Sequence, residues 1–156
     1  GAVLGYTDYA EAANDPAVVQ IMEEVCRSLN QSLSRRYGIT EMEQAEFSAR
    51  AVRKFQNRSI RDTIERNARD VQRKLGPRER MIAPLLIMKE YGCDTSALEK
   101  ATAAAVLYGE RTGTLKLDGE PVENPAECLG ELLSELDEET LSQIRKEYER
   151  LRTGFS

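Results

Sequence analysis

The sequence predicts an all-α fold, in which residues 1–156 form one multi-helix domain with a small β-hairpin near residues 114–122. Apolar side chains recur at steps of three and four residues through most of the chain, which is the spacing of one helix face. Capping residues precede these stretches, and glycine follows several of them. No apolar run approaches the roughly 20 residues that a membrane-spanning helix requires, so we expect no membrane partner.

The first long helix is predicted from its two ends. Asn14-Asp15-Pro16 supplies a cap followed by proline in the first turn. Gly38 can adopt the left-handed conformation that ends a helix. Between these ends, one apolar face is expected to be buried: Val18, Met22, Val25, Leu29 and Leu33.

A second helix is predicted to begin at the capping box Thr40-Glu41-Met42-Glu43 and to stop near Gln56-Asn57. We expect this helix to turn three side chains inward: Phe47, Ala51 and Phe55. A shorter helix over about Ile60–Lys74 follows, and Gly76-Pro77 stops it.

Further helices and a hairpin are predicted beyond Pro77. One helix runs to Tyr91-Gly92 with Pro84 in its first turn or at a kink, and another covers Ala97–Tyr108. Residues around Asp118-Gly119 alternate as in a hairpin, and Pro121 confines that hairpin to an edge. Asn124-Pro125 starts the next helix, through Leu129, Leu132 and Leu133. Asp137 caps the last one, whose apolar face is Leu141, Ile144, Tyr148 and Leu151.

The charge distribution singles out one cationic segment. From Arg50 to Arg80, eleven Lys or Arg stand against four Asp or Glu, a net +7 in a chain whose formal total is −5. On a helix over 60–74, four basic residues would share one stripe: Arg66, Arg69, Arg73 and Lys74. Guanidinium groups suit phosphate or carboxylate, because they offer paired N–H donors in a planar fork. A solvated surface face is the alternative interpretation of the same stripe.

The composition excludes several chemistries. The chain has no histidine and no CxxC motif, which argues against a metal site and against a Ser–His or Cys–His nucleophile pair. Its three widely spaced cysteines indicate reduced thiols and a cytoplasmic location. A pI of about 5.0, with no aromatic residues interleaved in Arg66–Arg80, argues against a nucleic-acid partner.

The same cationic segment resembles the C-terminal domain of the mannitol dehydrogenase family, the polyol-specific long-chain dehydrogenases. The matching strings are Phe55-Gln56-Asn57, Asp62-Thr63-Ile64-Glu65-Arg66, Arg73-Lys74-Leu75 and Arg80-Met81-Ile82-Ala83-Pro84. Outside this block, Gly5–Ala12, Arg35-Arg36-Tyr37-Gly38 and Ala101–Leu107 also resemble family motifs. The resemblance extends from about Gly5 to Tyr108 and fades beyond Gly109.

The resemblance implies an NAD-dependent oxidoreductase that interconverts mannitol 1-phosphate and fructose 6-phosphate. In the family, an N-terminal Rossmann domain binds NAD, and the substrate lies between it and the helical domain. We therefore expect this chain to be the C-terminal, substrate-side domain, with the Rossmann domain, the catalytic lysine and the Asn-x-x-His motif absent upstream. It would then contain no catalytic, cofactor-binding or metal-binding residue, and would be inactive alone.

Residue by residue, the resemblance assigns substrate contacts to Arg66 and Lys74. Arg69 and Arg73 are candidates for further phosphate contacts, with Arg58 and Arg80 secondary to them. Asn57 also matches a family position, and its simpler interpretation is a cap or turn residue. The chain departs from the family at Arg58 and at Val71-Gln72, where relatives carry Pro and Pro-Leu. Two alternatives stay open: a sugar acid such as altronate or fructuronate as substrate, or a stand-alone helical module that docks an acidic partner.

Overall fold

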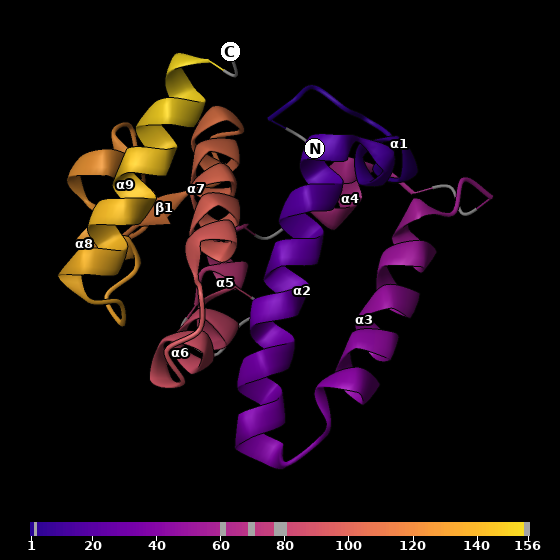
Figure 1. The fold of residues 1–156 in the computed structure, drawn as a ribbon. Helices are drawn as coiled ribbons and strands as arrows, with labels where there is room; N and C mark the ends of the chain where they lie inside the picture. The colour runs from indigo at the N-terminus through magenta and orange to yellow at the C-terminus, as the bar shows by residue number, and fades with distance from the viewer. Residues whose placement is uncertain (2, 60–61, 69–70, 77–80, 155–156) are drawn as a thin grey trace. The chain divides into compact units, whose positions relative to one another are not determined.

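The computed structural model of the chain describes residues 1, 3–59, 62–68, 71–76 and 81–154, with the backbone alone at residues 71 and 72 (Figure 1). Within these ranges, the regular structure is helical apart from one two-stranded antiparallel sheet. The predicted all-α class with a small hairpin is therefore confirmed. The chain divides into two compact units, residues 1–67 with 87–97 and residues 68–86 with 98–156.

Two long antiparallel helices dominate the first unit, α2 (Pro16–Tyr37) and α3 (Glu41–Gln56) (Figure 1). The short helix α1 (Tyr9–Asn14) packs against both. The unit also includes α4 (Ile64–Asn67) and the C-terminal part of α6 (Ile82–Glu90).

The predicted boundaries of α2 and α3 are confirmed. The carboxylate of Asp15 accepts from the backbone N–H of Ala17 at 2.8 Å, and Gly38 ends α2 with a φ of 67°. At the start of α3, Thr40 and Glu43 bond to each other's backbone N–H, as a capping box requires.

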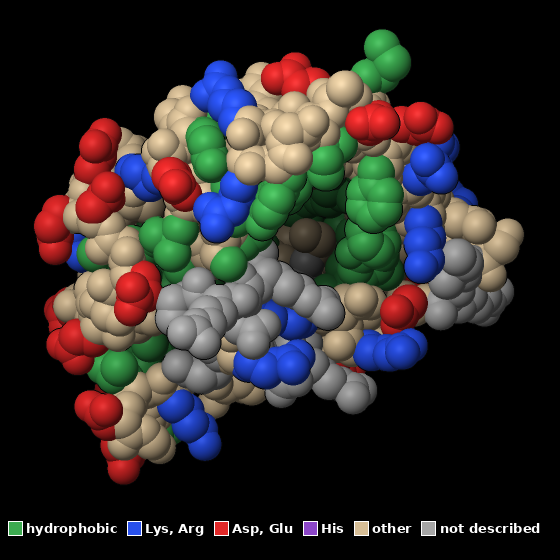
Figure 2. Space-filling view, turned by 90° about the horizontal axis from the view of Figure 1, so that it is seen from below, with side chains coloured by type: hydrophobic (Ala, Val, Ile, Leu, Met, Phe, Trp, Pro, Cys, Tyr) green, Lys and Arg blue, Asp and Glu red, His purple; other side chains and the backbone are tan. Residues whose placement is uncertain are grey.

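The predicted apolar faces of α2 and α3 differ from the observed ones. The predicted face of α2 is only half-buried, and its buried residues are instead polar: Ser28, Asn30 and Ser32. α3 has no buried residue. Phe47 is 70% exposed and Phe55 is 40% exposed, so the prediction that they point inward was wrong. The reason is that α3 turns smaller side chains toward α2, where the Ser48 hydroxyl donates to Asn30 Oδ1 at 2.9 Å. Hydrophobic side chains consequently reach the surface among charged ones (Figure 2).

Small side chains from α1 form much of the core of the first unit. Its buried apolar residues are Ala10, Ala12, Ala13, Ile64, Met88 and Ala97. Two contacts tie α1 to the end of α3. The Asn14 amide donates to the Gln56 carbonyl oxygen at 3.0 Å, and the rings of Tyr9 and Phe55 lie 5.2 Å apart between centroids.

The second unit contains the remaining elements. They are α5 (Val71–Lys74), the first part of α6, most of α7 (Ser96–Arg111), β1 (Lys116–Leu117), β2 (Glu120–Pro121), the 3₁₀-helix η1 (Pro125–Glu127), α8 (Leu129–Leu132) and α9 (Glu138–Thr153). α7 and α9 lie side by side (Figure 1), and the Tyr148 hydroxyl donates to Glu110 Oε2 at 2.5 Å. Burial, and then this hydrogen bond, raise the pKa of Tyr148.

The predicted buried face of α9 is confirmed, since Leu141, Ile144, Tyr148 and Leu151 are all buried. The hairpin is also confirmed, with positive φ at Asp118 (52°) and Gly119 (83°) as a two-residue turn requires. The helix predicted from Asn124-Pro125 is interrupted. It appears as η1 and then α8, with a break at Cys128, and Gly130 is a poor helix former inside α8.

None of the helices in the described ranges is both long enough and apolar enough to cross a membrane.

Acid is expected to destabilise the protein below about pH 4, where aspartates begin to protonate. Hydrogen bonds lower the pKa of Asp15, Asp62 and Asp94 in the folded chain. A carboxylate with a lowered folded pKa stabilises the fold above its unfolded pKa, and that contribution is lost as pH falls through the folded pKa. Urea midpoints measured between pH 7 and pH 2.5 would show the decline.

Asp94 provides the specific control for the acid effect, because its carboxylate accepts from both the backbone N–H and the hydroxyl of Ser96 (3.0 and 2.7 Å). Asp94→Asn keeps an acceptor oxygen but cannot titrate. Its midpoint should fall less steeply between pH 4 and 2.5 than that of the parent. Identical slopes would contradict the assignment of this part of the acid effect to Asp94.

Candidate functional site

Arg66 lies on α4, whose start is held by backbone pairing with the N-terminal segment. The N–H of Tyr9 donates to the Asp62 carbonyl oxygen, and the N–H of Ile64 donates to that of Thr7, both at 3.0 Å. The buried side chain of Ile64 anchors α4 in the core of the first unit. The backbone at Arg66 is therefore fixed, while its side chain is 70% exposed and can reach a ligand.

One carboxylate partly neutralises Arg66. Arg66 Nη1 lies 3.5 Å from Asp62 Oδ1, at the long end of the hydrogen-bonding range. Hydrogen bonds from the Asn67 side chain and the Thr63 N–H, together with the Arg66 charge, lower the pKa of Asp62. Exposed ion pairs of this kind contribute little free energy. A phosphate or carboxylate ligand can therefore compete with Asp62 for the Arg66 guanidinium.

Arg73 and Lys74 are neighbours on α5, in the second unit. Arg73 is exposed and Lys74 is half-buried, while the next residue, Leu75, is buried in the core. The Gly76 N–H donates to the Arg73 carbonyl oxygen at 3.0 Å and ends α5. Burial of Leu75 fixes the backbone from which the two cationic side chains extend.

The single helix predicted over Ile60–Lys74 was wrong. The described residues of that range form two four-residue helices, α4 and α5, with a turn at Ala68. The Asn67 amide donates to the Thr63 carbonyl oxygen at 3.0 Å, and such local bonds make asparagine a poor helix former. Arg66, Arg73 and Lys74 thus do not share one helical stripe. Arg66 belongs to the first unit, and Arg73 and Lys74 belong to the second.

The other basic candidates have different positions. Arg69 and Arg80 lie outside the described residues. Arg58 is exposed just after α3. Asn57 caps α3, and its Oδ1 accepts from the Ser59 N–H at 3.0 Å. The interpretation of Asn57 as a cap or turn residue is confirmed.

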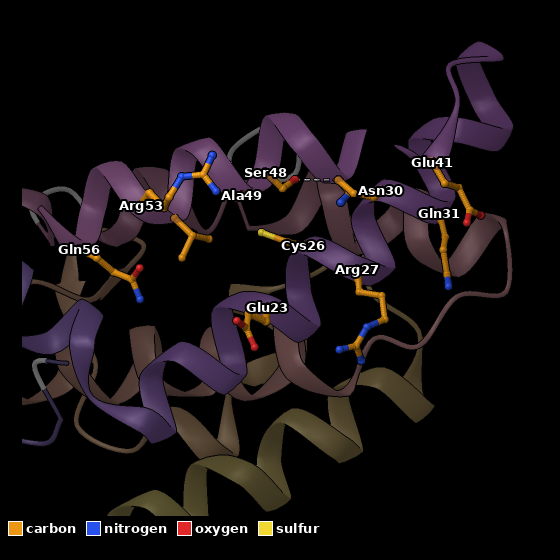
Figure 3. A pocket seen from close by; sticks show the side chains of 12 residues that line it. Glu23, Cys26, Arg27, Asn30, Gln31, Glu41, Ser48, Ala49, Arg53 and Gln56 are labelled. Atoms are coloured by element: carbon orange, nitrogen blue, oxygen red, sulfur yellow. Dashed lines mark hydrogen bonds between the residues drawn. The ribbon is translucent and has the colours of Figure 1, made fainter. Parts of the chain in front are cut away.

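A pocket of about 420 Å³, not predicted from the sequence, lies between α2 and α3 (Figure 3). Cys26 and Asn30 extend into it from α2, and Ser48 from α3 (Figure 3). Burial raises the pKa of the Cys26 thiol, which keeps it protonated and poorly nucleophilic at neutral pH. Among the residues that the structure describes, Arg66, Arg73 and Lys74 do not line this pocket.

One pattern in the sequence could have indicated this pocket. Small side chains recur at helical spacing along α3, at Ala45, Ser48, Ala49 and Val52, and all four line the pocket. The prediction followed the larger residues Phe47 and Phe55 instead. Small residues mark the side of a helix that can approach a neighbour closely, and here they identify the side of α3 that faces α2.

Metal binding has no support in the described ranges, where no three His, Cys, Asp or Glu side chains lie close enough to share an ion. All three cysteines are free and half-buried. What the described site offers chemically is cationic hydrogen-bond donors on short, anchored helices.

The sequence matches the mannitol dehydrogenase C-terminal domain over residues 1–148. The chain belongs to this family. The match continues well past Tyr108, where the motif resemblance fades, and it spans both compact units.

Three curated relatives are mannitol-1-phosphate 5-dehydrogenases. The Enterococcus faecalis protein is 31% identical over 156 residues, which cover 96% of this chain and 40% of the relative. The Paenarthrobacter aurescens protein is 31% identical over 137 residues, covering 88% and 33%. A protein of an Exiguobacterium species is 28% identical over 108 residues, covering 69% and 28%. The chain thus spans two fifths or less of the length of these relatives.

Proposed function

We propose that this chain is the substrate-side domain of an NAD-dependent oxidoreductase that interconverts mannitol 1-phosphate and fructose 6-phosphate. Membership of the mannitol dehydrogenase C-terminal domain family carries this proposal, and the names of the three relatives support it. Residues 1–156 act as one domain in this proposal, because the family match spans both compact units.

Arg66 and Lys74 hold oxygen atoms of the substrate, and Arg69 and Arg73 add phosphate contacts. The exposure of Arg66 and its weak pairing with Asp62 support the first assignment. The anchoring of α5 by Leu75 supports the second. These groups position the substrate carbon that reacts, and correct positioning alone can lower a barrier by several kcal/mol.

A Rossmann domain supplies the remaining parts of the catalytic site. It holds NAD, which accepts or donates the hydride, and a catalytic lysine and an Asn-x-x-His motif accompany it. We assign none of these roles to this chain, which has no histidine and no G-x-G-x-x-G sequence. The chain alone is therefore inactive in this proposal. Its free cysteines support a reducing, cytoplasmic setting.

The proposal is tested by following NADH oxidation with the protein as its gene encodes it. Fructose 6-phosphate should be reduced with a kcat/KM at least about tenfold higher than fructuronate, since a phosphate dianion forms stronger charge-assisted bonds than one carboxylate. The reverse preference would favour the sugar-acid alternative, because arginines also suit carboxylates. No reduction of either compound would contradict the oxidoreductase proposal.

A further inference from the structure

The outer face of α3 is an exposed surface that the proposed catalytic role does not use. α3 contains no buried residue, and Phe47 near its middle is 70% exposed. The opposite side of the helix lines the pocket against α2. A single exposed aromatic side chain is common on protein surfaces and does not by itself indicate a partner. The charged residues around Phe47 carry the inference.

Helical spacing defines which residues share this face with Phe47. Glu43, Phe47, Arg50 and Lys54 are separated by four, three and four residues, the spacing of a helix–helix contact seam. All four side chains are exposed. We call these four residues the α3 seam.

The charges of the α3 seam are self-complementary. Reading the seam in the opposite direction exchanges Glu43 with Lys54 and Phe47 with Arg50. Two copies of α3 packed antiparallel about a two-fold axis would therefore place each Glu43 beside the partner's Lys54. Each Phe47 ring would lie against the partner's Arg50, as a cation–π pair. Such an isologous contact uses the same patch on both copies, so the assembly is a closed dimer and does not grow further.

Among the described residues, internal pairing leaves the charges of this face only partly satisfied. Arg50 Nη2 lies 3.5 Å from Glu46 Oε1, with both side chains about two-thirds exposed (67% and 69%), which is a weak pair. Glu43 accepts from Thr40 in the capping box through one carboxylate oxygen, Oε2. Its other oxygen is available to a lysine from a second chain.

We propose that the α3 seam binds the same seam of a second copy of this chain, antiparallel, to form a dimer. One helix face buries less area than the roughly 1,200–2,000 Å² of a stable interface. The dimer is accordingly weak and reversible, and salt weakens it because its ion pairs are exposed.

Exchanging the charges of the seam gives a direct test by sedimentation equilibrium up to about 1 mM protein, because an interface of this size is expected to associate weakly. Lys54→Glu alone and Glu43→Lys alone should each be monomeric, because like charges then face each other at both ends of the seam. An equimolar mixture of the two variants should associate as heterodimers, since every facing pair is again of opposite sign. Phe47→Ala should be monomeric. Far-UV circular dichroism checks the helix content of each variant, above all of Glu43→Lys, which loses one half of the capping box.

Arg53→Glu is the matched control for Lys54→Glu. It makes the same change of charge one residue away, but Arg53 lines the pocket side of α3, so dimerisation should persist. A monomeric parent protein at 1 mM would overturn the proposal. So would a mixture that fails to associate, or an Arg53→Glu variant as impaired as Lys54→Glu.

Discussion

Replacing Lys74 with alanine in the assembled enzyme is expected to lower kcat/KM for fructose 6-phosphate by about 10- to 100-fold. A hydrogen bond from a charged donor contributes about 1.5–3 kcal/mol, and each 1.4 kcal/mol is a factor of ten. Arg66→Ala should have an effect of similar size. If these groups bind the ground state and the transition state equally, KM rises while kcat is unchanged.

Two further variants separate substrate binding from simple loss of charge. Arg111→Ala removes one positive charge at an exposed position at the end of α7, outside the proposed substrate residues. Its kcat/KM should stay within about twofold of the parent, because solvent and salt screen an exposed charge. Arg66→Lys keeps the charge but loses the planar fork, so it should recover only part of the activity. If the kcat/KM values of Lys74→Ala and Arg66→Ala stay as close to the parent as that of Arg111→Ala, the assignment of the substrate site is wrong.

Ile144→Ala is expected to lower the free energy of unfolding by about 2–5 kcal/mol. Ile144 is fully buried in the second unit, on the face of α9 that also carries Leu141, Tyr148 and Leu151. Truncation removes buried apolar surface and leaves a cavity that the neighbouring side chains fill only partly. Urea unfolding followed by circular dichroism at 222 nm measures the change.

Gln143→Ala is the control for that substitution, because residue 143 precedes Ile144 on α9 and is exposed. Its stability should stay within about 0.5 kcal/mol of the parent, as surface changes usually do. Alanine is the best helix former, so helix propensity favours both variants. Losses of equal size would therefore contradict the assignment of the effect to burial of Ile144.

Capping and turn residues in the sequence correctly predicted where helices begin and end and where the hairpin turns. The caps at Asp15 and Thr40, the glycine at Gly38 and the Asp118-Gly119 turn all have a local physical cause, and the structure confirms each. Burial was harder to predict, because it depends on the partner of a helix. The hydrophobicity of Phe47 suggested an inward position, but the polar contact between Ser48 and Asn30 turns the other side of α3 toward α2.

For the candidate site too, the signals in the sequence were predicted correctly and the three-dimensional arrangement was not. Composition alone located the cationic segment, and the motifs within it identified the family that the comparison confirms. The prediction of one continuous helix, which would have aligned the basic residues, was wrong. The Asn67 side chain bonds back to the Thr63 carbonyl oxygen, and a turn follows at Ala68. The roles of Arg66, Arg69, Arg73 and Lys74 stay predictions for the experiments above.

The way α6 joins the two units has a practical consequence for genetic dissection. Its first residues belong to one unit and its last residues to the other, and the stretch 87–97 returns to the helices at the start of the chain. There Arg36 Nη1 meets Glu90 Oε2 at 3.2 Å, and Arg35 bonds to the Tyr91 carbonyl oxygen. A gene fragment that ends at residue 67 would encode helices that lack these two contacts. We therefore do not expect either half of the chain to fold stably by itself.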